Sequence, residues 1–163
     1  MAKRNVEIEG FGELMKKLTA LGGNVPKATH DGLIKGGEVV QGVAKKLCQV
    51  DTGRLRNSIE VSGEKKHKYT YSVGKGKSKQ EYEGIITGGG ESAVVVGTNV
   101  EYAPYVEFGT GLRGDPTVAH RQDWEGQPPQ PFLSPALALS EEKVKQRITA
   151  ELKKSIREAV NDG

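Results

Sequence analysis

The feature that most constrains the fold is an apolar stripe in the C-terminal part of the 163-residue chain. Its members recur at steps of seven and four residues, the spacing of one face of an α-helix: Leu137, Val144, Ile148, Leu152, Ile156 and Val160. Charged residues occupy the opposite face. Ser134 and Pro135 stand just before the stripe, and a serine cap followed by proline at the first helical position is a common helix start. We therefore expect a long amphipathic helix that runs from there to the C-terminus.

A second long helix is expected from Val25 to Leu47, with Asn24 as its cap. Its apolar and small residues also follow helical spacing, and they are Leu33, Gly36, Val40, Val43, Ala44 and Leu47. Glycines at positions 32, 36, 37 and 42 would each cost up to about 1 kcal/mol relative to alanine in a helix interior. Such glycines either allow a neighbouring backbone to approach closely or mark a loose helix end.

Shorter elements complete the expected fold. Apolar–polar alternation predicts strands at 5–9, 58–62, 69–73 and 93–98, and helical spacing predicts a short helix beginning at Phe11. Two polar segments rich in glycine or proline, 75–90 and 109–130, are predicted to be long loops. The order of elements predicts one α+β domain over residues 1–163. In it, a small antiparallel sheet packs against a long helix, with the long C-terminal helix and extended loops beside them.

Composition excludes several classes of protein. Cys48 is the only cysteine, which rules out an internal disulfide and a multi-cysteine metal site. No apolar run reaches membrane-spanning length and no apolar signal region begins the chain, so we expect a soluble protein made in a reducing cytosol, without membrane association. The net charge of +3 is too even to imply nucleic-acid binding by itself. A hydrophobic share of 35% indicates a modest core and a surface that is either solvated or reserved for partners.

No residue pattern supports catalysis or a cofactor. Gly76-Lys77-Ser78 resembles the end of a phosphate-binding loop, but Tyr71 stands where that loop requires glycine. The three histidines are scattered, with none at metal-ligand spacing. Glu101 and Glu107 are six positions apart, so on a helix they would point to different sides. We predict no catalytic, cofactor-binding or metal-binding residue.

Six lysines flank the strand predicted at 69–73: Lys65, Lys66, Lys68, Lys75, Lys77 and Lys79. They could face DNA phosphates or an acidic partner. Alternatively, they are solvated residues that protect an exposed edge strand. Both interpretations remain open at this point.

The segment EYAPYVEFGTG, residues 101–111, is predicted to form one short helix or turn. Gly109 would end it as a left-handed cap. Its aromatic face would pack on the sheet, with tyrosine hydroxyls reaching polar partners at the rim.

Three segments together resemble one known family. VDTGRLRNSI (50–59), VGTNVEYAPYVEFGTG (96–111) and QPFLSPAL (130–137) occur in the order typical of the Hong Kong-type siphovirus tail-component family. Members are variously called tail-completion, neck or head–tail joining proteins, and the resemblance runs from about Phe11 to the end of the chain. The structural motif residues that carry over are Asp51, Thr52, Gly53, Gly97, Tyr102, Tyr105, Glu107, Phe108, Gly109, Pro131, Phe132 and Pro135.

Within these motifs we expect structural roles. Asp51 and Thr52 would cap the turn that carries Arg54 and Arg56. Glu107 is expected to form a salt bridge with an arginine, such as Arg54, or a hydrogen-bonded corner. The segments 75–90 and 112–127 look longer than a minimal family member needs.

The resemblance implies a non-enzymatic virion structural protein. It would assemble in the host bacterial cytoplasm as a homo-oligomeric ring, a hexamer, that joins the tail tube to the head connector in the neck. Its partners would be other copies of itself, a head-completion protein, and the tail terminator or tail tube protein, with DNA passing through the lumen beside the lysine-rich hairpin. Two alternatives are a tail terminator ring that caps the tube and a basic nucleic-acid-binding module acting alone.

Overall fold

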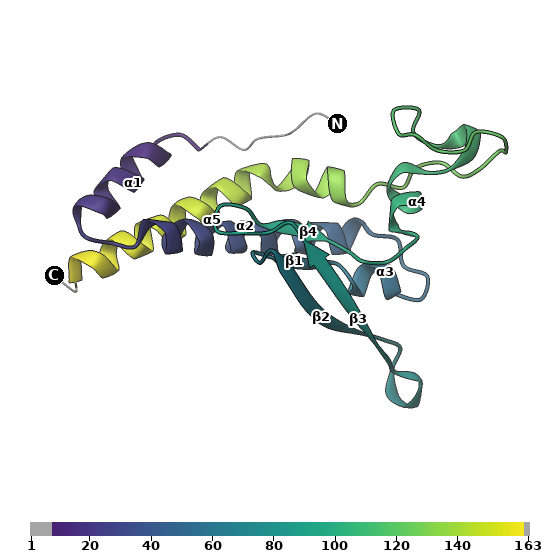
Figure 1. Ribbon diagram of the computed structural model, residues 1–163, viewed down its shortest axis with the longest axis horizontal. Coiled ribbons are helices and arrows are strands. Elements are labelled where there is room, and N and C mark those ends of the chain that lie inside the picture. Colours follow the sequence, from purple (N-terminus) through teal and green to yellow (C-terminus); the bar gives the residue numbers. More distant parts are fainter. Residues whose placement is uncertain (1–7, 162–163) are drawn as a thin grey trace.

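The computed structural model describes residues 8–161 (Figure 1). The fold is α+β, as predicted. Two long helices dominate it and two small antiparallel sheets flank them. The helices are α1 (Phe11–Ala20), α2 (Val25–Leu47), α3 (Arg54–Asn57), α4 (Ala103–Phe108) and α5 (Leu133–Asn161). The strands are β1 (Glu60–Ser62), β2 (Lys66–Val73), β3 (Gln80–Thr87) and β4 (Val95–Gly97).

Helices α2 and α5 lie side by side along the long axis of the molecule (Figure 1). Glycine makes their close approach feasible, because a Cβ added at Gly32 would lie 3.3 Å from the Cα of Ile148. One added at Gly36 would lie 3.0 Å from Val144 Cγ1. A Cβ at Gly37 would instead meet the sheet, 2.8 Å from Val61 Cγ1. Three of the four helix glycines therefore serve close packing, whereas Gly42 faces open space.

The β-structure forms two separate pairs of strands. β1 and β4 are antiparallel, with Val61 opposite Val96, and this pair packs on α2. β2 and β3 form a hairpin in which Lys66 pairs with Thr87 and Val73 with Gln80. The hairpin projects away from the helices (Figure 1). Residues 5–7 of the strand expected at 5–9 lie outside the described residues, and Ile8 and Glu9 are not in a strand.

The prediction of a continuous loop over 75–90 was wrong, because half of this segment is the strand β3. Its charged and glycine residues concealed the strand pattern. Glu81 and Glu83 face solvent, while Tyr82 and Gly84 lie on the inner face. Gly84 is required there, since a Cβ at this position would collide with the ring of Tyr69. The true turn is short and contains a 3-10 helix at Gly76–Ser78. The segment 109–130 is largely irregular, as expected, apart from a 3-10 helix at Gly111–Arg113 and a bridge between Thr110 and Gln127.

The core lies where the helices, the β1–β4 pair and the start of α5 meet. Leu18, Ile59, Phe132 and Leu152 have no exposed surface. They come from α1, the end of the first motif, the third motif and α5, so one core joins segments from the whole described chain.

The glycines of α2 give a matched test of this packing. Gly42→Ala should stabilise the protein by up to about 1 kcal/mol, because alanine favours the helix and its methyl group meets nothing. Gly37→Ala should destabilise it by roughly 1–3 kcal/mol, because the methyl group would overlap Val61 and Val94. Urea unfolding of both variants measures the difference, and equal effects would contradict the close approach at Gly37.

Candidate functional site

The second and third motifs meet at a buried carboxylate. Glu107, in α4, is only 6% exposed. Its Oε2 accepts hydrogen bonds from the backbone N–H groups of Phe132 at 2.8 Å and Leu133 at 3.0 Å. Its Oε1 accepts two more from Ser134, one from the backbone N–H at 2.8 Å and one from the hydroxyl at 2.6 Å. Glu107 therefore supplies acceptors for the first turn of α5, whose N–H groups have no partner within the helix.

Two expectations about this corner need correction. α5 begins at Leu133, so Ser134 lies inside its first turn rather than capping it. The cap is the Glu107 carboxylate, which comes from a distant part of the chain. Glu107 also forms no ion pair with Arg54. Among the described residues no basic nitrogen lies within 4.0 Å of its carboxylate. The expected hydrogen-bonded corner is present, and its donors are three backbone N–H groups and the Ser134 hydroxyl.

The electrostatics of Glu107 follow from these contacts. Burial alone would raise the pKa of the carboxyl group, because it penalises the charged form. The hydrogen bonds from Ser134, Phe132 and Leu133 outweigh burial, and the pKa lies below its ordinary value of 4.5. The positive end of the α5 dipole favours a negative charge at the same place. Glu107 is therefore a charged structural group at neutral pH.

Arg54 has a different role from the one expected. Its guanidinium carbon lies 4.7 Å from the centre of the Tyr82 ring, which is the geometry of a cation–π contact. Tyr82 in turn stacks on Tyr71 of the neighbouring strand, with ring centres 5.5 Å apart. A hydrogen bond from Asn57 Nδ2 to the Ser72 carbonyl, 2.8 Å long, adds to the contact. Helix α3 thus anchors the projecting hairpin to the body of the protein.

The first motif forms a tight turn before α3. Gly53 has φ of 83°, a conformation that favours glycine, and it precedes the helix. Thr52 Oγ1 accepts a 3.3 Å hydrogen bond from the Arg54 N–H within this turn, but the residue at the cap position of α3 is Gly53. Asp51 is exposed, and no hydrogen bond of its side chain is present in the described part of the chain.

Direct contacts join the three motifs. The hydroxyls of Ser58 and Thr98 lie 2.5 Å apart and connect the first motif to the second. Gly97 ends β4 opposite Glu60, beside this contact. Glu107 connects the second motif to Phe132 and Ser134 of the third. Pro131 precedes this junction, and Pro135 lies in the first turn of α5. The motifs are thus the joints of the fold.

The aromatic face of α4 does not pack on the sheet, contrary to the expectation. Tyr105 is 57% exposed and Tyr102 is 39% exposed, and only Phe108 is half-buried. Gly109 does have a positive φ of 71°, but its ψ of −172° is not that of a left-handed cap. Instead the chain leaves α4 extended and enters the loop 109–130.

Exposed apolar side chains gather at this end of the molecule. Tyr105 and Trp124 line one surface depression together. The Leu112 N–H donates a 2.9 Å hydrogen bond to the Trp124 carbonyl, so these two residues are neighbours. Leu112 is 70% exposed and Trp124 54% exposed. We call Tyr105, Leu112 and Trp124 the aromatic end. Sequence reasoning missed it because Leu112 and Trp124 lie in a segment without periodicity.

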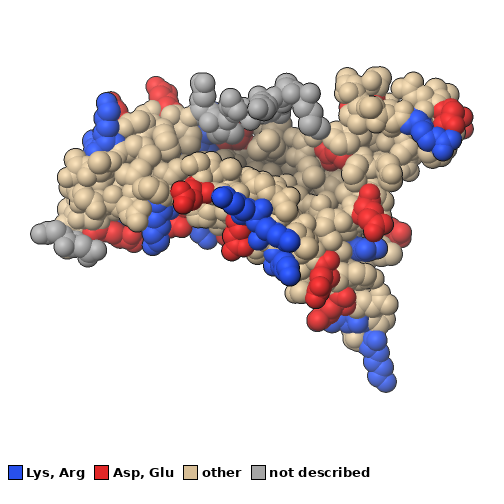
Figure 2. All heavy atoms as spheres, viewed as in Figure 1, with Lys and Arg blue, Asp and Glu red and all other residues tan. Residues whose placement is uncertain are grey.

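The lysine-rich hairpin is exposed but not uniformly basic. All six predicted lysines are exposed. Glu64, Glu81 and Glu83 lie among them, and Lys79 pairs with Glu81 at 3.3 Å. Figure 2 shows basic and acidic side chains side by side along the hairpin. The tip, with Lys75 and Lys77, is its most basic part.

Other kinds of site find no support in the described residues. Between residues 8 and 161 no three acidic, histidine or cysteine side chains are grouped as metal ligands would be. In the same range no helix has the length and hydropathy needed to span a bilayer. His30, His67 and His120 lie in separate places, and Cys48 is buried with a pKa raised by burial.

Residues 12–109 match the family described as "Bacteriophage HK97-gp10, putative tail-component". The match covers more than half of the chain and includes the first motif and the second motif as far as Gly109. The chain therefore belongs to this family and has a structural role in a bacteriophage tail. The third motif and α5 lie beyond the matched residues, so the match ends earlier than the resemblance suggested. No curated protein and no solved structure matches the chain.

Replacing Glu107 tests the importance of the corner. Glu107→Ala should lower the free energy of unfolding at pH 7 by about 2–4 kcal/mol, because buried and part-buried N–H groups would lose their acceptor. Glu107→Gln should also lower it, because its NH2 group cannot accept and would face donors that a carboxylate oxygen now serves. Glu101→Ala, an exposed neighbour, should change it by less than about 0.5 kcal/mol.

The effect of Glu107→Gln on the free energy of unfolding should depend on pH. Because the folded-state pKa of Glu107 lies below 4.5, its contribution is fully present above that pH and is lost as pH falls through the folded-state value. The difference between wild type and Glu107→Gln should shrink below pH 4.5. Denaturant titrations from pH 7 to pH 3 measure it, and a constant difference would contradict the charged role of Glu107.

Proposed function

We propose that this tail component is a non-enzymatic ring subunit that completes the tail and joins the tail tube to the head connector. The observation that carries the proposal is the aromatic end, because exposed side chains of this size on a projecting loop are typical of an interface. Family membership supplies the setting, a phage virion. The subunit count we propose is six.

The shape of the subunit supports assembly into a ring. The loop 109–130 and the hairpin project from the helices in different directions (Figure 1). A ring requires that one patch of each copy meet a different patch of the next copy. Projections carrying exposed apolar and charged groups are suited to such contacts. Copies of the same chain are therefore the first partners we propose.

The remaining partners that we propose follow from a position in the neck. A neck ring contacts a head-completion or connector protein on one side and a tail terminator or tube protein on the other. A tail terminator ring is the second candidate. Abnormal tail length in the absence of the protein would favour it over the joining role.

Complementation tests whether the aromatic end is an interface. In a phage that lacks this gene, a plasmid copy with Trp124→Asp and Leu112→Asp should fail to restore plaques, and titres should be lower by on the order of a hundredfold or more. The reason is that the two aspartates place negative charge at the centre of the proposed contact. Val160→Asp is the matched control, since Val160 is as exposed as Trp124 but lies at the end of α5. Full rescue by the Trp124 and Leu112 variant, with the variant protein folded by circular dichroism, would contradict this use of the aromatic end.

We further propose that the tip of the hairpin faces the lumen through which DNA passes. Charge reversal at Lys75, Lys77 and Lys79 should then lower infectivity by on the order of tenfold while leaving ring mass unchanged, because the tip would repel phosphates. Reversal at the exposed Lys16, Lys17 and Lys46 is the control of equal charge. Unchanged infectivity would remove the proposal for the hairpin and leave the ring in place.

DNA binding by the isolated protein distinguishes a ring subunit from a nucleic-acid-binding module. A module acting alone would bind DNA as a monomer with an affinity that falls steeply with salt. The mixed charges of the hairpin favour weak binding.

A further inference from the structure

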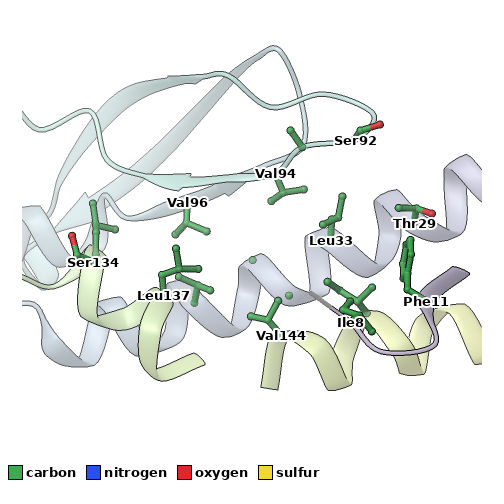
Figure 3. Close-up of a pocket in the computed structure, with 16 residues that line it drawn as sticks. Ile8, Phe11, Thr29, Leu33, Ser92, Val94, Val96, Ser134, Leu137 and Val144 are labelled. Atoms are coloured by element: carbon green, nitrogen blue, oxygen red, sulfur yellow. The ribbon is translucent and has the colours of Figure 1, made fainter. Parts of the chain in front are cut away.

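Two hollows in the described part of the chain differ in chemistry. One is an apolar groove of about 1050 Å³ between α2, α5 and the segment that leads into β4, and Figure 3 shows Val94 and Val144 on its opposite walls. Its lining consists of apolar residues, glycine, serine and threonine. The other is the depression at the aromatic end, where His120 and Arg121 lie beside Trp124. Histidine changes its charge between pH 5 and 8, so this depression is the one that pH can alter.

His120 ties two parts of its loop together. Its Nε2 lies 2.8 Å from the carbonyl oxygen of Gly111, and its Nδ1 lies 2.5 Å from that of Val118. The ring is half-buried and packs on Gly114, where an added Cβ would lie 2.7 Å from Nε2. Gly111 begins the 3-10 helix that carries Leu112, so the position of the ring sets that of the aromatic end.

The chemistry of the two contacts decides the protonation state of the ring. Both partners are backbone carbonyl oxygens, which only accept hydrogen bonds, so each ring nitrogen must carry a hydrogen. The neutral imidazole has a hydrogen on one nitrogen, whereas the imidazolium ion has one on each. In the neutral ring, whichever tautomer forms, a nitrogen lone pair would face a carbonyl oxygen at 2.5 or 2.8 Å. The contacts are therefore complete only when His120 is protonated.

We propose that His120 is a pH-sensitive switch in the loop 109–130. The protonated ring holds Gly111 and Val118 together and fixes the aromatic end. Loss of the proton replaces one hydrogen bond by repulsion between two acceptors, and the loop loosens. The stabilisation is thus present at low pH and is lost as pH rises through the range in which histidine titrates. The switch is a property of the isolated subunit, and its effect on contacts through the aromatic end rests on the function proposed above.

Asp115 is the carboxylate that favours the protonated ring. Hydrogen bonds from Thr117 have the largest effect on its carboxyl group and lower the pKa below the ordinary value of 3.8. The positive charge of His120 lowers the pKa of Asp115 further, so the two groups are close enough to interact. Asp115 remains charged throughout the range in which the ring titrates.

The other ionisable groups of the segments packed against the ring are uncharged or already paired. Each of the two arginines lies against a carboxylate of the same loop, Arg113 with Glu125 at 3.5 Å and Arg121 with Asp123. Tyr105, from α4, lines the same depression and is an uncharged phenol between pH 5 and 8. The charges of these pairs partly cancel, so they place no large positive field against a protonated ring.

The single tryptophan of the chain makes the switch measurable. Trp124 lines the same depression as His120. In the isolated protein, the Stern–Volmer constant for acrylamide quenching should rise by about 1.5-fold or more from pH 5.5 to pH 8.0, because the loosened loop exposes the indole. His120→Gln should show the high value at both pH values. His67→Gln, which removes a histidine of the hairpin, should leave the rise unchanged.

Two results of this experiment would overturn the proposal. Equal quenching at the two pH values in the wild-type protein would mean that the loop does not respond to pH. A rise that persists in His120→Gln would assign the response to another group. Circular dichroism at both pH values checks that each protein is folded. Since only isolated subunits are used, the outcome does not depend on whether the protein joins head and tail.

A second variant tests the switch with the histidine in place. Asp115→Asn keeps an acceptor for Thr117 but removes the charge beside the ring. It should move the midpoint of the quenching change to lower pH by a few tenths of a unit. Glu158→Gln, the same loss of charge at the exposed end of α5, should leave the midpoint where it is. An unchanged midpoint in Asp115→Asn would contradict a transition driven by protonation of His120.

Discussion

The fold depends on the contact between Glu107 and the first turn of α5. A carboxylate this buried is unfavourable unless donors compensate it, and three backbone N–H groups and one hydroxyl do so. The same N–H groups would otherwise be unsatisfied at a partly buried helix end. The N–H groups therefore compensate the buried charge of the carboxylate, and the carboxylate supplies the acceptor that the N–H groups lack. The contact also fixes where α5 begins, and α5 is the helix against which the glycine face of α2 packs.

This contact joins a part of the chain that matches the family to a part that lies outside the match. Residues 12–109 carry the family pattern, and α5 lies beyond it. Glu107 stands almost at the end of the matched region and binds the segment that follows it by more than twenty residues. The intervening loop 109–130 can thus vary or project without loosening the core. Its exposed Trp124 and Leu112 are then available for contacts with other proteins.

Sequence reasoning located the helices well because helical periodicity is a local property of long segments. α2 begins and ends at the expected residues, and Asn24 caps it as predicted, with its Oδ1 accepting a 3.0 Å hydrogen bond from Lys27. β3 was missed because a strand with one charged face and a central glycine resembles a loop when its partner is unknown. A hydrogen-bonded corner at Glu107 was among the predictions, but the partner named for it, an arginine, was wrong. No local pattern indicates that backbone groups far along the chain will bind this carboxylate. The exposure of Tyr102 and Tyr105 was missed for a related reason. Aromatic residues predict burial, and only the fold shows on which side of α4 the core lies.

The central claim is that this tail component joins the tail to the head. Electron microscopy of a lysate from a phage that lacks the gene tests it most directly. The account predicts full heads beside separate tails of normal length, because each part would assemble without the ring that connects them. Tails of uncontrolled length would assign the protein to the end of the tube instead, and ordinary infectious virions would contradict a structural role in the neck.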